Sequence, residues 1–125
     1  MKILFTSSSY IPPKRRPIKK IQITFKDGTV LPPIDEIKRL DATDVFIKTL
    51  AIIGLKTIFE RANPMNRGEE LLKDRQHTKH PEQSHQIGDS PYFISTYCST
   101  EDKKRFLEDI NQRLKLGMTV KLIEI

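Results

Sequence analysis

Apolar and polar residues alternate over residues 21–25 (Ile-Gln-Ile-Thr-Phe), which is the pattern of a strand with one buried face. Asp27-Gly28 follows, and a second short run of strand-forming residues comes directly after it. Asp-Gly between two such runs predicts a two-residue turn of type I′, since both central positions of that turn need a positive φ. Pro32-Pro33 then ends the second strand, because proline cannot donate a hydrogen bond to a neighbouring strand. We therefore expect a β-hairpin over residues 21–31.

The spacing of the apolar residues changes to three and four between residues 41 and 53, which predicts an amphipathic helix. Asp41 is a good N-cap, and Gly54 is the expected C′ residue. The apolar stripe of this helix consists of Phe46, Ile47, Leu50, Ala51 and Ile53. Residues 34–40 predict a single helical turn before it. Residues 55–59 fit a second short helix or a strand, because their apolar spacing is compatible with both.

The last third of the chain predicts a strand, a helix and a closing strand. Residues 92–98 are rich in strand-forming residues, and Ser99 or Thr100 then caps a helix that ends near Gly117. The apolar face of this helix consists of Phe106, Leu107, Ile110 and Leu114. The closing strand covers residues 119–125. Such a unit most simply forms a right-handed crossover between parallel strands, although antiparallel pairing also fits.

Two segments lack a regular pattern. Residues 7–20 contain three prolines, which fix φ and remove backbone donors, so we expect an extended arm there. A short strand at residues 2–6 would precede it. Residues 63–90 are polar and contain several Gly, Pro and Asn residues, which predicts a long polar loop.

These elements predict an α+β fold in which a small mixed sheet of four or five short strands carries two main helices on one face. We expect residues 21–125 to form a single domain and residues 1–20 to form an extended basic N-terminal arm. Open strand edges in so small a sheet favour a symmetric homodimer.

The basic residues are concentrated at the N-terminus. The chain of 125 residues has 22 Lys and Arg against 16 Asp and Glu, a net charge of +6. Residues 1–26 hold seven basic residues and no acidic one, whereas the other 99 residues hold 15 basic and 16 acidic ones. No apolar run approaches the ~20 residues of a membrane helix, and the single cysteine, Cys98, excludes an internal disulfide. We therefore expect a cytoplasmic protein that does not cross a membrane and that acts through its arm.

The densest basic cluster places five cations within seven residues, namely Lys14, Arg15, Arg16, Lys19 and Lys20. Such a cluster can neutralise several phosphates and release their counterions, and Tyr10 nearby could stack on a base. The 63–90 loop, which carries Lys73, Arg75 and Lys79, or the run Lys103-Lys104-Arg105 would add phosphate contacts. We predict a non-enzymatic nucleic-acid-binding accessory module, and both DNA and RNA fit.

Other interpretations of the arm are open. Tyr10, Ile11 and Ile18 lie between its cations, so the arm would also fit an acidic protein partner or the neighbouring subunit of a homo-oligomer. A solvated tail, or one that protects a sheet edge from aggregation, fits too. A helix-turn-helix over residues 42–62, with Gly54 in the turn, is another alternative, although the outward side chains of its second helix are mixed in charge.

A metal-dependent nuclease is a further alternative. Asp27 and Glu36-Ile37-Lys38 resemble the Asp…Glu-x-Lys pattern of such enzymes. Asp27 is better explained as a turn residue, however, and Glu36 follows two prolines in a predicted helical turn. No glycine-rich phosphate loop is present, and we expect no cofactor.

The three histidines, His77, His80 and His85, all lie in the 63–90 loop. His77 and His80 could share one helical face and, with a nearby carboxylate, bind zinc. No third ligand stands at a recognised spacing, and Pro81 interrupts any helix there. We therefore expect no metal site in this loop.

Two stretches resemble a small α/β domain of uncharacterised bacterial proteins from mobile-element or defence neighbourhoods. They are residues 21–30, and residues 95–125 with their Ser-Thr-Tyr-Cys-Ser-Thr start and Val-Lys-Leu-Ile-Glu-Ile end. The resemblance covers most of residues 21–125 and leaves the basic arm outside. It rests on a hairpin and a capped helix and implies no catalytic residue. By analogy, it favours a role in nucleic-acid biology.

Overall fold

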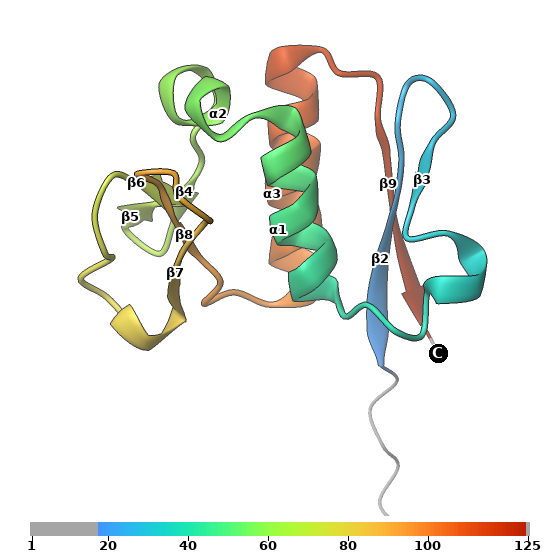
Figure 1. Ribbon diagram of the computed structural model, residues 1–125, viewed down its shortest axis with the longest axis horizontal. Coiled ribbons are helices and arrows are strands. Elements are labelled where there is room, and N and C mark those ends of the chain that lie inside the picture. The colour runs from blue at the N-terminus through green and yellow to red at the C-terminus, as the bar shows by residue number, and fades with distance from the viewer. Residues whose placement is uncertain (1–17, 125) are drawn as a thin grey trace, which may run out of the picture.

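The computed structural model describes residues 18–124. The predicted strand at residues 2–6 and the predicted site residues Tyr10, Lys14, Arg15 and Arg16 lie outside the described residues. Two long helices form a central layer, with a three-stranded sheet on one side and a group of short strands on the other (Figure 1). The α+β class predicted from the sequence is confirmed.

The three-stranded sheet brings both ends of the described chain together. β2 (Lys19–Thr24) is its central strand and pairs antiparallel with β3 (Val30–Leu31) and β9 (Thr119–Glu124). Ile21 and Ile23 of β2 are completely buried. Because alternate residues of a strand point to opposite faces, these two isoleucines give the sheet an apolar face, which packs on the helices.

The turn between β2 and β3 is longer than predicted. The N–H of Gly28 donates to the carbonyl of Phe25 at 2.9 Å, and the N–H of Phe25 donates to the carbonyl of Thr29 at 2.8 Å. Only Gly28 has a positive φ, +91°, so this is a type I turn with a glycine bulge rather than a type I′ turn. The Asp27 carboxylate accepts the Thr29 N–H at 2.9 Å, and this bond lowers the pKa of Asp27.

A 3-10 turn, η1 (Ile34–Glu36), leads into α1 (Ala42–Ile53), as the sequence predicts. The Asp41 side chain accepts the N–H of Asp44 at 2.9 Å, and α1 ends at Gly54. The buried residues of α1 are Ala42, Val45, Phe46, Thr49 and Leu50. The buried face therefore lies about one position earlier than the predicted stripe, and Ala51 is exposed. The ambiguous segment after Gly54 is a helix, α2 (Leu55–Arg61).

α3 (Thr100–Leu114) lies beside α1 (Figure 1). The Ser99 hydroxyl accepts the N–H of Asp102 at 3.0 Å and the Asp102 carboxylate accepts the N–H of Ser99 at 3.4 Å, which completes a capping box. The helix ends at Lys115 with φ +53°, two residues before the predicted Gly117. None of the helices in residues 18–124 is both long enough and apolar enough to cross a membrane.

Residues 63–90 are not the loop that the sequence predicts. They contain four short strands and a 3-10 turn, and a fifth short strand follows. These elements are β4 (Met65–Asn66), β5 (Glu69–Glu70), β6 (Leu72–Lys73), η2 (Pro81–Gln83), β7 (Ser84–Gln86) and β8 (Phe93–Ser95). β4 pairs with β5, and the others form a sheet in the order β6-β8-β7. Strands of two or three residues are too short to show a periodic pattern.

The described strands form three small antiparallel sheets rather than one mixed sheet. The predicted parallel crossover between residues 92–98 and 119–125 is wrong, because β8 and β9 belong to different sheets. Figure 1 shows the reason: β8 lies on one side of α3 and β9 on the other, so the chain passes through the helical layer instead of returning to the same sheet.

Candidate nucleic-acid interface

Two cations that the sequence assigns to the arm are residues of β2. Lys20 is only 9% exposed, and its Nζ donates to the carbonyl of Leu40 at 3.4 Å. Lys19 forms an ion pair with Glu101 in the first turn of α3, which lowers the pKa of Glu101. The assignment of both lysines to an extended arm is wrong, since pairing with β9 orders this segment. Its burial argues against Lys20 as a phosphate contact.

Lys103 is also buried, although the sequence predicts it as a phosphate contact. It is 4% exposed, and its Nζ donates to the carbonyls of Cys98 at 2.6 Å and Thr96 at 3.5 Å. Position 103 lies four and seven residues before the buried Leu107 and Ile110, so it falls on the inner face of α3. The prediction for Lys103 is therefore wrong.

The two neighbouring cations stay on the surface. Lys104 donates to Glu108 at 2.9 Å, and Arg105 pairs with Asp102. The Arg105 side chain is 71% exposed. Of the predicted run 103–105, Arg105 is the residue that lines a pocket.

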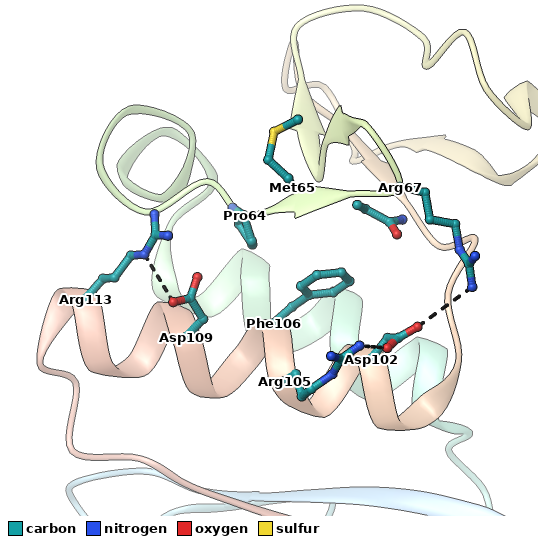
Figure 2. Close-up of a pocket in the computed structure, with 9 residues that line it drawn as sticks. Pro64, Met65, Arg67, Asp102, Arg105, Phe106, Asp109 and Arg113 are labelled. Atoms are coloured by element: carbon teal, nitrogen blue, oxygen red, sulfur yellow. Dashed lines mark hydrogen bonds and ion pairs between the residues drawn. The ribbon is translucent and has the colours of Figure 1, made fainter.

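A groove of about 670 Å³ separates the β4–β5 hairpin from α3 (Figure 2). Its walls come from Pro64, Met65, Asn66 and Arg67 on one side and from Asp102, Arg105, Phe106, Asp109 and Arg113 on the other. The α3 residues are spaced by three, four and seven positions, which places them on one helix face. Phe106 lies between the two pairs of charged groups, so the groove has an apolar centre and charged ends (Figure 2).

Three guanidinium groups and two carboxylates line this groove. Arg105 pairs with Asp102, Arg113 contacts Asp109 at 3.2 Å, and Arg67 approaches Asp102 to 4.0 Å. The arginine side chains are 51–71% exposed, whereas the Asp102 side chain is only 20% exposed. Each guanidinium has five N–H donors, and these contacts use only part of them. The groove therefore carries one net positive charge and offers free donors to an anion.

Arg67 reaches the groove from a strained turn. Asn66 pairs with Glu69, so Arg67-Gly68 is a two-residue turn, and φ is +53° at Arg67 and +90° at Gly68. Two positive φ values define a type I′ turn, which favours Asn, Asp or Gly at its first position rather than Arg. The Nζ of Lys79 donates to the Arg67 carbonyl at 3.1 Å and so stabilises the turn.

Arg67 also contacts an exposed aromatic pair. Its Cζ lies 5.3 Å from the centre of the Tyr97 ring, within the range of a cation–π interaction. The His80 ring stacks on Tyr97 with the ring centres 3.5 Å apart and the planes 15° apart. A second depression, of about 340 Å³, lies beside this pair and is lined by Arg67, Gln83, Thr96, Tyr97, Cys98 and Ser99. Burial raises the pKa of the Cys98 thiol.

Buried polar groups hold the hairpin in place. The Glu69 carboxylate accepts hydrogen bonds from the Lys73 ammonium at 2.6 Å and from the N–H groups of Lys79 at 2.7 Å and Thr78 at 3.1 Å. These bonds lower the pKa of Glu69 to about 2, the Lys73 contact most of all. The Asn66 amide donates to Ser95 Oγ at 3.1 Å and so ties β4 to β8.

The structure separates the three histidines. His77 is 2% exposed; its Nε2 donates to the carbonyls of Glu70 and Leu71, and its Nδ1 lies 2.7 Å from the Ser84 hydroxyl. His80 stacks on Tyr97, and His85 lies 3.0 Å from the Thr96 hydroxyl. Residues 18–124 contain no group of three or more His, Cys, Asp and Glu side chains placed to hold a metal.

The nuclease-like residues serve local structure. Asp27 accepts a hydrogen bond within its own hairpin turn, and Glu36 lies in η1. Neither lines the groove between β4 and α3.

The chain matches no family model, no curated protein and no solved structure. The resemblance to domains of mobile-element or defence proteins therefore stays a prediction.

Sequence reasoning missed Arg67, Tyr97 and Arg113 as site residues. The signal for Arg67 was present, since Asn66-Arg67-Gly68 contains two turn-forming residues around one arginine. No local signal marks Tyr97, because its partners come from two other turns.

Proposed function

We propose that this protein is a non-enzymatic nucleic-acid-binding module. Its phosphate contacts come from the groove between the β4–β5 hairpin and α3 and from the basic N-terminal segment, residues 1–17. The observation that carries the proposal is the convergence of Arg67, Arg105 and Arg113 on one groove. Arginine recognises phosphate through paired N–H donors, and such contacts recur where proteins hold a nucleic-acid backbone.

The charge of the N-terminal segment supports the same proposal. Residues 1–17 carry four of the basic residues and no acidic one. The chain joins this segment to β2 next to Lys19, which pairs with Glu101 of α3. Glu101 is the neighbour of Asp102, which lines the groove, so β2 begins near the end of α3 that carries Asp102.

The test is a salt titration of binding, measured by fluorescence anisotropy with labelled single-stranded DNA, duplex DNA and RNA. Removing Arg105 and Arg113 by substitution with Gln should weaken binding to each nucleic acid that is bound and lower the slope of log K against log salt by about one to two. A variant with Lys48→Gln and Lys56→Gln loses the same charge at exposed positions outside the groove and should leave the slope within experimental error. Absence of binding to every nucleic acid at low salt would overturn the proposal.

Deletion of residues 1–17 tests the second part of the proposal. The deletion removes four cations. Combined with the groove substitutions, it should lower the slope of log K against log salt further than those substitutions do alone, because the two sets of contacts are separate. If the deletion variant binds as the full chain does, the N-terminal segment makes no phosphate contact and only the groove is left.

A second candidate function is self-association through β9. Among the described strands β9 pairs only with β2, so its other edge presents unpaired backbone groups over six residues. Sedimentation velocity should then show a dimer, and Ile123→Lys should disrupt it while Ile52→Lys, on the exposed face of α1, should not. A single-chain mass over a wide concentration range would exclude this function.

A further inference from the structure

The aromatic pair beside the groove has the geometry of a base-stacking platform. The rings of His80 and Tyr97 are nearly parallel, and both side chains are exposed, His80 to 45% and the whole of Tyr97 to 37%. Since one face of the imidazole lies against Tyr97, the exposed area of His80 belongs to its other face and its edges. A third planar ring can therefore continue the stack.

Two residues whose side chains contact Tyr97 have a left-handed backbone conformation. Among residues 18–124, three non-glycine residues have a positive φ, namely Arg67, His80 and Lys115. Lys115 ends α3, where such a conformation is ordinary. The other two both place their side chains against the Tyr97 ring. Strain of this kind persists where the surrounding structure holds it, and it concentrates at binding sites.

Arg67 connects the platform to the groove. Its guanidinium lies 5.3 Å from the centre of the Tyr97 ring and 4.0 Å from the Asp102 carboxylate, and the residue lines both depressions. A strand whose phosphates contact Arg105 and Arg67 would thus have a base within reach of the platform. In a duplex the bases stack on each other and are hidden, so only an unpaired base can use it.

We infer that the ligand is single-stranded nucleic acid, and that the His80–Tyr97 stack takes one of its bases while Arg67 and Arg105 hold the flanking phosphates. This inference rests on the proposed function and specifies its ligand. It needs no covalent step and no cofactor.

The experiment measures the affinity of the full chain for a 20-nucleotide thymidine strand, the same strand made entirely of abasic sites, and a 20-base-pair duplex. The wild type should prefer the thymidine strand to the other two. Tyr97→Leu should weaken binding of the thymidine strand about tenfold and leave binding of the abasic strand and the duplex within about twofold. Tyr97→Phe keeps the ring and should bind as the wild type does.

Thermal unfolding of each variant confirms that it is folded. If Tyr97→Leu is unfolded, His80→Ala replaces it, because His80 is exposed and its loss removes the outer ring of the stack. Equal affinities of Tyr97→Leu and Tyr97→Phe for the thymidine strand, or a preference of the wild type for the duplex, would overturn the inference and leave the proposed function standing. Failure to bind any of the three probes would overturn both.

Discussion

At the scale of single residues, this protein uses charged side chains inside the fold as well as on its surface. Lys103 and Glu69 are both nearly inaccessible to solvent, and different hydrogen bonds compensate each of them for the lost contact with water. Lys103 donates to two backbone carbonyls, whereas Glu69 combines an ion pair with two backbone N–H donors. Burying a charge is costly unless it is hydrogen-bonded, so each becomes a position where the loss of one group leaves others without a partner.

Lys103→Ala should lower the free energy of unfolding by about 1–3 kcal/mol, because the Cys98 carbonyl loses this donor and the Thr96 carbonyl keeps only the N–H of Cys98. Lys103→Met keeps most of the apolar stem, so it should lose the hydrogen bonds of the ammonium group but keep the packing of the side chain. Urea unfolding measures both. Lys104→Ala removes the same charge from the next residue, which is on the surface, and should change stability by less than about 0.5 kcal/mol. Equal effects at the two positions would refute the role of Lys103.

Glu69 predicts how stability depends on acid. Its pKa in the folded protein is about 2, below the ordinary value of 4.5, so its stabilising contribution is complete above pH 4.5 and is lost as the pH falls towards 2. Unfolding of the wild type should therefore become easier over this range, whereas Glu69→Gln should lose less stability. Urea titrations at pH 6, 4 and 3 test this, with Glu70→Gln at the exposed neighbouring position as the control. Parallel pH profiles for Glu69→Gln and the wild type would contradict it.

At the scale of elements, the sequence predicted those that have strong local signals. The ends of α1 and the start of α3 follow from Asp41, Gly54 and Ser99, because capping needs only neighbouring residues. The strands between residues 63 and 90 could not be predicted in the same way. They are two or three residues long, and some of their buried groups are polar. Asn66 bonds to Ser95, 29 residues further along the chain, and Glu69 to the backbone of Lys79, ten residues further along.

The candidate site was predicted less well, because charge alone does not say where a side chain points. Lys103, Lys104 and Arg105 are alike in the sequence, yet one is buried and another lines the groove. The spacing of Lys103 to Leu107 and Ile110 would have placed it inside. Tyr97 could not have been found, since the stack depends on how two separate turns fold against it.

The β4–β5 turn gives a prediction in which stability and binding change in opposite directions. Arg67→Asn should stabilise the protein by about 1 kcal/mol, because Asn tolerates a positive φ better than Arg does. It should also weaken nucleic-acid binding, since the guanidinium is lost. Thermal unfolding and anisotropy measure the two effects.

Lys115→Asn is the matched control, because Lys115 has the same φ of +53° but lies at the end of α3 and lines neither depression. It should gain similar stability and keep its affinity. If Arg67→Asn is destabilising, the turn is not strained by the arginine.

At the scale of the whole molecule, one continuous core connects all three layers. Ile21 of β2, Phe46 of α1, Leu107 of α3 and Ile94 of β8 are completely buried in the same apolar cluster. The helices are therefore covered on both sides, which is why the chain needs the short strands as well as the three-stranded sheet. We expect the layers to unfold together.

Phe46→Ala should lower the free energy of unfolding by about 3–5 kcal/mol, since it leaves a cavity in the shared core, where Phe46 is completely buried. Hydrogen exchange should then speed up in β2 and in β8 by similar factors, because both pack on the same cluster. Ala51→Gly at an exposed position of α1 should cost only about 1 kcal/mol. Faster exchange confined to one layer would show that the layers unfold separately.

Arg67 is shared by two neighbouring depressions, and sharing makes their occupants thermodynamically dependent on each other. A guanidinium drawn towards a phosphate near Asp102 moves away from Tyr97 and so alters the His80–Tyr97 stack that takes the base, and a base on that stack alters the position of the guanidinium that meets the phosphate. Linkage requires that phosphate binding change the affinity for the base by the same factor as base binding changes the affinity for the phosphate. Inorganic polyphosphate has no bases, so it would occupy only the phosphate contacts. The extent to which it changes the preference of the protein for the thymidine strand over the abasic strand therefore measures the size of that coupling.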